Sequence, residues 1–350
     1  MECSTQEGIV VRVLNFNGRQ ELEVLVGSEW AKAINYPELT GPCQLFDRVL
    51  LNTTAQQLKL GTGGSHYVIA VWGRERSLSK RGHIMKLRYT PSQGRVLSVE
   101  EEASPYHATM VKARDLGGLI VAVGSLHSML APLAWTLYDK LGPVRLVYLM
   151  SDGAALPIAI SQVVAILKQR KLLTKTITFG HAFGGDFEAV NIYSALLAAK
   201  HVVRADLAVV LMGPGVVGTN TTWGTTALEQ GMFLNAVLQL GGVPVAIPRL
   251  SEADSRERHY GLSHHTRTVL TTLVSTPILV PLPNYLKRFS QAMEEVGHLQ
   301  HEIKWEDTDA SFATLDQSRL PLKTMGRGPT EDPLFFHGVV AAALSMVALL

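Results

Sequence analysis

The chain has 350 residues, of which 47% are hydrophobic and 18% are charged, and its formal net charge is +2. These values exclude a disordered chain and allow more than one hydrophobic core. The near balance of charge argues against nucleic acid as the main partner.

The N-terminal part of the chain is predicted to form short strands. Apolar or alternating segments separated by Gly, Pro and Asn occur at 8–13, 22–26, 47–51, 66–72, 84–89 and 95–99. This pattern is typical of a small β-barrel or β-sandwich. The basic run at 74–81 is interpreted as a solvated loop, with a phosphate-binding patch as the alternative. Acidic residues at 100–102 mark its end, so this β module is predicted to span residues 1–103.

The remainder, residues 104–350, is predicted to be an α/β domain. Its apolar runs are 119–123, 144–150, 176–179, 206–212, 243–247 and 278–280. Helical patterns begin at Met129 and Pro157 and cover 188–203, 225–240 and 263–273. Strands that are apolar on both faces and alternate with helices indicate a parallel sheet with right-handed connections. We therefore expect a Rossmann-like parallel-sheet domain with a C-terminal helical extension.

The two ends of the chain carry no membrane signal that the sequence reveals. The N-terminus lacks the basic and apolar regions of a secretory signal. The apolar tail at 335–350 is shorter than the roughly 20 residues that a spanning helix needs. We expect a docked terminal helix, and the alternatives are a membrane anchor and a homo-oligomer paired through this tail. Only two cysteines, Cys3 and Cys43, are present, which favours a reducing, cytoplasmic location.

Small and polar residues follow five of the predicted strands. In open parallel sheets, ligands bind outside the carboxyl ends of the strands. The segments concerned are 124–128, 151–153, 180–188, 213–220 and 259–266. The candidate ligand-binding residues in them are Ser125, His127, Ser128, Asp152, Gly184, Gly185, Gly213, Gly215, Gly218 and Thr219. We expect one polar site there for a small anionic ligand, such as a phosphorylated one.

The segment 213–218 has the spacing G-x-G-x-x-G of a dinucleotide-binding turn. Residues 219–224 intervene before the predicted helix, and Pro248 and Arg249 stand where a ribose-binding acid is expected. NAD is therefore disfavoured. The backbone amides could still bind a phosphate or carboxylate, or the glycines could serve only close helix–strand packing.

Five further residues are candidates for catalysis. His181, Asp186 and Glu188 lie within eight positions and could hold a divalent metal or act as a base with its orienting acid. In the alternative interpretation, Asp186 caps a helix, Glu188 favours its positive end and His181 is merely hydrogen-bonded. His264 and His265 are adjacent at a predicted helix start. Neither the spacing H-E-x-x-H nor a cysteine cluster occurs, so the cofactor stays unspecified.

Eight segments carry a resemblance to a known family. They are AINYPELTGP at 33–42, DRVLLNTTA at 47–55, LGTGGSHYV at 60–68, GHIMKLRYTP at 82–91, GGDFEAVNIYSALLAAKHV at 184–202, MGPGVVGTNT at 212–221, LSHHTRT at 262–268 and TMGRG at 324–328. In these segments the chain resembles the bacterial family called domain of unknown function 3866 (DUF3866). The resemblance covers nearly the whole chain. It implies a cytoplasmic bacterial protein and supplies no reaction.

Two functions are compatible with these patterns. The favoured one is an enzyme or a binder of a small anionic ligand, with its site at the carboxyl ends of the parallel strands. The alternative is a non-catalytic adaptor or nucleic-acid-associated protein that uses the N-terminal β module. Aromatic residues are only 7% of the chain and do not interleave with basic ones, which counts against this alternative.

Overall fold

The structure is a computed structural model that describes residues 2–58, 64–78 and 81–350. Residues 60–63 of the segment LGTGGSHYV, and Lys80 of the basic run, lie outside the described residues. Contacts between residues divide the chain into one unit of Met1–Arg81 with Leu87–Arg95 and a second of Gly82–Lys86 with Val96–Leu350. The sequence predicted a boundary after residue 103. The structure instead groups Gly82–Lys86 and residues 96–103 with the second unit.

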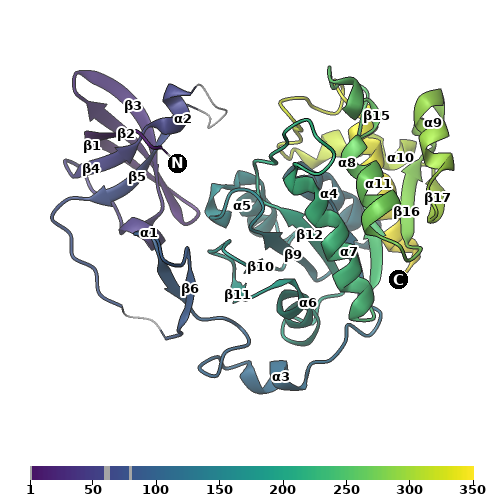
Figure 1. The fold of residues 1–350 in the computed structure, drawn as a ribbon, viewed down its shortest axis with the longest axis horizontal. Coiled ribbons are helices and arrows are strands. Elements are labelled where there is room, and N and C mark those ends of the chain that lie inside the picture. Colours follow the sequence, from purple (N-terminus) through teal and green to yellow (C-terminus); the bar gives the residue numbers. More distant parts are fainter. Residues whose placement is uncertain (1, 59–63, 79–80) are drawn as a thin grey trace. The chain divides into compact units, whose positions relative to one another are not determined.

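The first unit contains a closed five-stranded barrel (Figure 1), which confirms the prediction of a small β module. Its strands, in spatial order, are β1 (Thr5–Phe16), β2 (Arg19–Val26), β3 (Glu29–Asn35), β5 (Ser65–Val71) and β4 (Arg48–Asn52). β3 and β5 are parallel and the other neighbours are antiparallel, the strand order of an OB-fold barrel. Alternating residues such as Val10, Val24 and Val49 fill the interior.

The first unit also contains the short helices α1 (Pro37–Thr40) and α2 (Thr54–Gln57). The short strand β6 (Ile84–Lys86) and the helix α3 (His107–Lys112) belong to the second unit, and the short strand β7 (Gly94–Val96) lies at the boundary between the two units.

The second unit is built on an eight-stranded sheet in which all neighbours are parallel. The spatial order is β11 (Phe187–Ala189), β10 (Lys175–Phe179), β9 (Leu146–Ser151), β12 (Leu207–Met212), β8 (Ile120–Val123), β13 (Val243–Ala246), β16 (Leu279–Pro283) and β17 (Glu302–Glu306). Every residue of β9 and β12 is buried, as expected for central strands covered on both faces. The Rossmann-like prediction is therefore confirmed.

The order of the strands reverses direction within the sheet. From β8 the chain moves one way through α4 (Leu130–Leu141) and α5 (Gln162–Gln169) to β9 and β10. It then returns through α6 (Ile192–His201) and α7 (Glu229–Gln239) to β12 and β13. The two helix pairs belong to different apolar clusters, one on each face of the sheet. The chain therefore leaves the neighbouring pairs β9–β12, β12–β8 and β8–β13 toward opposite faces, which is where ligands bind in such sheets.

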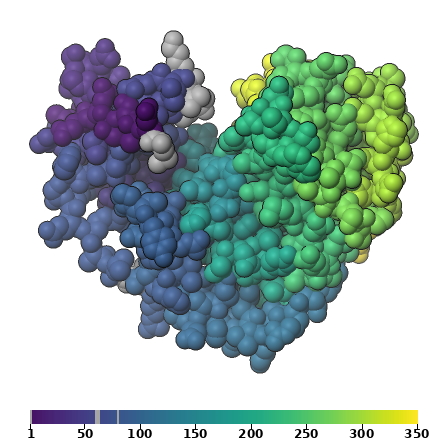
Figure 2. All heavy atoms as spheres, viewed as in Figure 1, coloured from purple at the N-terminus to yellow at the C-terminus, as the bar shows by residue number. Residues whose placement is uncertain are grey.

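The C-terminal residues form the buried helix α11 (Pro333–Ala348), which packs against α4 and β16. On the face shown in Figure 2, the yellow of the C-terminal residues is visible in small areas. The expected docked helix is confirmed. Pairing of two protomers through this tail stays a prediction, and Leu349 and Leu350 are its exposed large apolar residues. Within residues 2–58, 64–78 and 81–350, no helix combines the length and apolarity needed to cross a bilayer.

The remaining elements lie between these. They are η1 (His127–Met129), η2 (Ile158–Ile160), η3 (Thr226–Leu228), β14 (Leu250–Ser251), η4 (Glu257–His259), β15 (Gly261–Leu262), α8 (His264–Thr268), the π-helix η5 (Val269–Leu273), η6 (Asn284–Arg288), α9 (Ser290–Gly297), α10 (Asp309–Ala313) and η7 (Leu315–Ser318).

Candidate functional site

The loop after β12 and the first turn of α8 meet at the carboxyl ends of the strands. Gly218 lies against His265, since a Cβ built on this glycine would be 3.7 Å from the His265 Cε1 and 3.6 Å from Thr225 Oγ1. The sequence analysis named Gly218 and His265 from segments about 45 residues apart. The structure brings these two candidates together.

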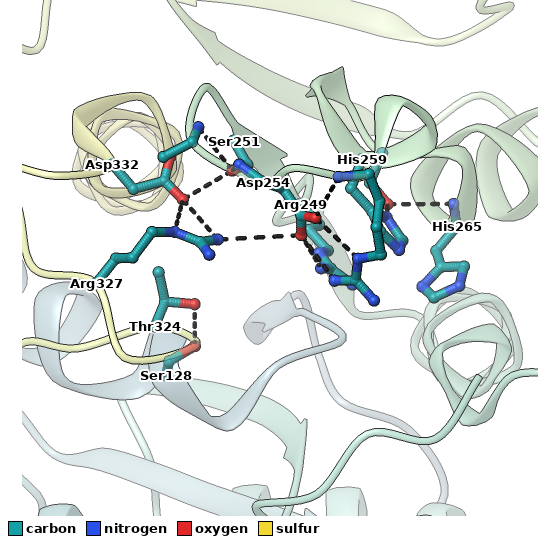
Figure 3. A network of polar contacts seen from close by, with 12 residues as sticks. Ser128, Arg249, Ser251, Asp254, His259, His265, Thr324, Arg327 and Asp332 are labelled. Carbon is teal, nitrogen blue, oxygen red and sulfur yellow. Dashed lines mark hydrogen bonds and ion pairs between the residues drawn. The ribbon is translucent and has the colours of Figure 1, made fainter. Parts of the chain in front are cut away.

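A polar network continues from there along the carboxyl ends of β8 and β13 (Figure 3). Ser128 Oγ donates a hydrogen bond to Thr324 Oγ1 at 3.1 Å. Arg327 pairs with the Asp332 carboxylate at 3.1 Å, and Ser251 Oγ donates to the same carboxylate at 2.7 Å. The network therefore fastens the loop after β8 and the loop after β13 to the segment 324–332.

Arginines outnumber carboxylates in the next part of this network. Arg249, only 3% exposed, pairs with Asp254 at 3.2 Å. Arg256 donates to both oxygens of the same carboxylate at 2.8 and 2.7 Å, and Arg327 Nη2 lies 4.0 Å from it. Burial lowers the pKa of Arg249 to about 10, against the attraction of Asp254. Three guanidinium groups thus share two carboxylates, those of Asp254 and Asp332.

Three histidines adjoin these arginines. The ring centroids of His264 and His265 are 4.2 Å apart, and each is 4.9 Å from that of His259. His259 is 2% exposed and His265 6% exposed. His259 Nδ1 is 2.8 Å from Ser263 Oγ, and Ser263 also caps α8 by accepting from the His265 amide at 3.3 Å.

Burial and the neighbouring arginines keep these imidazoles neutral. Burial lowers the pKa of His259 to about 3, with the positive charge of Arg249 acting in the same direction. Burial likewise lowers the pKa of His265 to about 3, with a smaller contribution from His264. The pKa of His264 is also lowered, first by burial and then by Arg258. We call Arg249, Asp254, Arg256, Arg258, His259, His264, His265 and Arg327 the histidine–arginine cluster.

A second group at the carboxyl ends of the strands, Asp152 and Glu229, is termed the carboxylate pair. Ser151 Oγ donates to the Glu229 carboxylate at 2.7 Å, and the His181 amide donates to Asp152 at 2.7 Å. Burial raises the pKa of Glu229, and the negative charge of Asp152 adds to this rise, against the Ser151 hydrogen bond. The carboxylate pair is therefore negatively charged, whereas the histidine–arginine cluster is positively charged. Within the pair, the Glu229 carboxyl group holds its proton more tightly than usual.

A family model matches most of this chain. The model described as protein of unknown function (DUF3866) covers residues 32–343. The chain belongs to this family. Among curated proteins, none matches it. Both the histidine–arginine cluster and the carboxylate pair of this DUF3866 protein lie inside the matched range.

The structure does not assemble His181, Asp186 and Glu188 in one place. After β10 the chain turns back, so that β11 runs parallel to β10 with Phe187 opposite Ile177. His181 therefore lies at the carboxyl end of β10, whereas Asp186 returns to the amino end. There its carboxylate accepts from Thr176 at 2.8 and 2.9 Å and pairs with Lys168 at 2.8 Å.

The alternative interpretation of Asp186 as a helix cap is wrong, and catalytic roles of Asp186 and Glu188 stay predictions. The cap of α6 is Asn191 rather than Asp186, because the helix begins only at Ile192. Glu188 lies on β11, where it accepts from Thr178 Oγ1 at 2.8 Å and pairs with the buried Lys86 at 3.3 Å. Burial raises the pKa of Glu188, against the charge of Lys86. These contacts fasten β6 to the sheet.

Several other predicted ligand residues of the DUF3866 protein are engaged in local contacts. His127 has both ring nitrogens bonded, to Tyr148 Oη at 3.1 Å and to Ser161 Oγ at 2.7 Å. Burial lowers the pKa of His127 to about 4. His127 therefore joins β8, β9 and α5. Ser125 differs, because its buried Oγ has no hydrogen-bond partner in the described part of the chain.

The predicted loop glycines also differ in their surroundings. The amides of Gly184 and Gly185 donate to Glu188 at 2.7 Å and to Thr178 at 3.1 Å, away from the histidines. A Cβ on Gly213 would lie 2.5 Å from the carbonyl oxygen of residue 155, so this glycine permits close backbone packing. Gly215 has open space where its Cβ would be. Thr219 Oγ1 forms hydrogen bonds within its own loop, to Thr221 and Gly224 at 3.0 Å.

The charged residues of the cluster are not among the site residues predicted from the sequence. Arg249 entered the prediction only as the residue that stands where a ribose-binding acid is expected, although it lies three residues after the end of β13. Arg327 lies in the segment 324–328, which carried the family resemblance without a role. Glu229 lies inside a predicted helix, where a charged residue is ordinarily a solvated one. The interactions of these three residues join segments that are far apart in the sequence, so no local pattern predicts them.

Two surface hollows lie elsewhere. One of about 270 Å³ is lined by α3 residues and His201, and one of about 630 Å³ is lined by barrel residues such as Arg12 and Gln44. Neither is lined by the histidine–arginine cluster. The candidate site is therefore identified by its buried polar atoms rather than by either of these hollows.

Proposed function

We propose that this DUF3866 protein binds a small anionic ligand, with a phosphoryl or carboxylate group, beside the histidine–arginine cluster. The observation that carries the proposal is the excess of guanidinium groups over carboxylates. Arg249, Arg256 and Arg327 share Asp254 and Asp332. The Nε of Arg258 is buried and has no hydrogen-bond partner in the described segments.

The physical reason is the free energy of unpaired charge. A guanidinium atom that is buried without an acceptor costs about 1–3 kcal/mol or more. A phosphoryl or carboxylate group can accept two parallel hydrogen bonds from such a planar group. An anion near Arg258 would therefore satisfy its Nε and balance the positive charge of the cluster.

The loop after β12 supplies a second element of the proposal. Gly218 lies against His265, so this glycine-rich loop reaches the cluster. Backbone amides of such loops bind phosphate groups without a charged side chain. The loop has the glycine spacing of a dinucleotide-binding turn, but residues 219–224 intervene before the next helix and no ribose-binding acid follows, so the proposed ligand is a small anion rather than NAD.

Isothermal titration with inorganic phosphate and pyrophosphate tests this function. We expect wild-type protein to bind at least one of them at millimolar concentration or below, and Arg258→Gln to bind at least tenfold more weakly. Arg145→Gln is the matched control, because Arg145 pairs with Asp206 at the amino ends of β9 and β12. Equal binding by wild type and Arg258→Gln would contradict the proposal, as would the absence of heat from both anions and from citrate.

A second function, binding of single-stranded nucleic acid by the barrel, is favoured by one observation. Ile9, Leu25 and Trp30 lie opposite one another on β1, β2 and β3, and Trp30 is 69% exposed. Exposed aromatic side chains on such barrels stack against bases. Fluorescence anisotropy with labelled oligothymidine tests it: we expect affinity that falls with salt and is lost in Trp30→Ala. Binding unchanged by Trp30→Ala would contradict it.

A further inference from the structure

We infer that His259, His264 and His265 bind a divalent transition-metal ion of the zinc type. Each offers one ring nitrogen, and these three atoms all lie within 4.8 Å of one another. In a tetrahedral zinc site with Zn–N distances of about 2.0–2.1 Å, the ligand atoms are roughly 3.4 Å apart. Closing the set therefore requires shifts of about 1 Å, which small rotations of the imidazoles supply.

The hydrogen bonds of the rings indicate which atoms face the ion. His264 Nε2 and His265 Nδ1 are buried, and the described residues offer neither a hydrogen-bond partner. A buried polar atom without a partner costs about 1–3 kcal/mol. A metal ion would satisfy both nitrogens at once, which packing of the three rings alone does not.

His259 has the arrangement of a metal-binding histidine. Its Nδ1 lies 2.8 Å from Ser263 Oγ, which leaves Nε2 for the ion. A ligating imidazole usually bonds through its other nitrogen to a group that fixes its orientation. Ser263 would be that positioning residue, and it also caps the helix that carries the other two histidines.

The three histidines come from η4 and the first turn of α8, within seven positions of one another. Adjacent residues of a long helix point about 100° apart. At this helix start the two adjacent rings are 4.2 Å apart, and both are 4.9 Å from the ring of His259. The turn of chain between η4 and α8 therefore assembles the set.

Charge around the histidines bears on what completes the coordination sphere. Arg249, Arg256, Arg258 and Arg267 add positive charge beside the rings. Asp254 pairs with Arg249 and Arg256, and Glu295 pairs with Arg267. A bare dication would be repelled there, whereas an ion that carries hydroxide or an anionic ligand would not. Three imidazoles with an open fourth position are also the ligand set of catalytic rather than structural zinc. The metal site does not depend on the proposed anion.

Titration of the full chain with Co²⁺, after removal of metal by a chelator, tests this inference. We expect one Co²⁺ per chain, with the visible absorption of tetrahedral coordination and displacement by Zn²⁺. His265→Gln should weaken binding at least 100-fold. The matched control is His201→Gln, because the His201 ring bonds to the carbonyl oxygen of residue 115 at the amino ends of the strands.

Ser263→Ala provides a variant that keeps all three ligands. Loss of the group that orients His259 should weaken metal binding by about 10–100-fold. This variant also keeps the inference testable if His265→Gln does not fold. Absence of the tetrahedral spectrum in folded wild-type protein would overturn the inference, and so would equal affinity in wild type, His265→Gln and Ser263→Ala.

Arg258→Gln separates this inference from the proposed function. It removes a guanidinium group but no histidine, so Co²⁺ affinity should stay the same or rise while phosphate affinity falls. Metal binding without phosphate binding would contradict the proposed function alone. Phosphate binding without the cobalt spectrum would contradict the metal site alone.

Discussion

The histidine–arginine cluster and the carboxylate pair lie at the same end of one sheet, yet they handle charge in opposite ways. In the cluster, Asp254 and the adjoining Asp332 pair with three of the four arginines, and burial leaves the imidazoles neutral. In the pair, Asp152 and Glu229 repel each other, and burial raises the pKa of Glu229. Removing a carboxylate should therefore lower the free energy of unfolding in the first region and should not lower it in the second.

Asp254→Asn should produce the largest effect. This change leaves Arg249 and Arg256 without their shared carboxylate, and loss of one partner of a buried pair costs about 3–5 kcal/mol. The variant should therefore unfold at much lower urea concentration than wild type at pH 7. Asp47→Asn, which breaks the pair with Arg74 in the barrel, is the comparison for a less buried site. Equal decreases in stability to urea in Asp254→Asn and Asp47→Asn would contradict the claim that the buried cluster depends more strongly on its carboxylate.

The same variant predicts a difference in pH dependence. Burial alone would raise the pKa of Asp254, but hydrogen bonds from Arg256 and the charge of Arg249 lower it below its usual value of 3.8. A lowered pKa gives stability that is fully present above pH 3.8 and is lost as the pH falls below it. Urea unfolding between pH 5 and pH 2.5 should show a weaker pH dependence in Asp254→Asn than in wild type.

Gly180→Ala should have the second-largest effect, because it tests the packing of the carboxylate pair. Gly180 has φ +66°, and a Cβ there would overlap the Asp152 carboxylate. Gly118→Ala is the matched control, since Gly118 has φ +74° and nothing within 4 Å of its Cβ position. Strain in the left-handed region costs about 1–2 kcal/mol in both. We expect Gly180→Ala to lose about 1–3 kcal/mol more in thermal unfolding, and equal losses would contradict the packing.

Glu229→Gln should have the smallest effect, and in the opposite direction. Because the pKa of Glu229 is raised, the folded protein loses stability as the pH rises through the usual value of 4.5 to the raised one. The amide keeps an acceptor for Ser151 and removes the repulsion with Asp152. We expect an unfolding free energy at pH 7 that is equal to wild type or higher by up to about 1 kcal/mol. A clear loss of stability would show that Glu229 has a cationic partner.

Much of the fold could be predicted from the sequence because burial on both faces produces long apolar runs. β9 and β12 were expected almost to the residue. β3 was missed because Trp30 and Lys32 face outward and interrupt the apolar pattern. β17 is absent from the predicted strands, since an edge strand with Glu302, Lys304 and Glu306 does not show an apolar run.

Some of the residues that lie at the carboxyl ends of the strands could be predicted from the sequence, while their function stays a prediction. The rule for the carboxyl ends of parallel strands found His264, His265 and Gly218. It failed at Asp186, because the reversal of the chain after β10 carries this residue to the other end of the sheet. It also missed Asp254 and Arg327, whose meeting depends on a contact across more than 70 residues.

Anomalous diffraction from crystals of the full chain grown with zinc and tungstate tests the central claim most directly. Tungstate has the shape and charge of a phosphate-like anion, and each metal has its own absorption edge. The account predicts a zinc peak bonded to His259, His264 and His265 and a tungsten peak in contact with Arg258. Ordered peaks only at other places, such as the barrel or the amino ends of the strands, would contradict it.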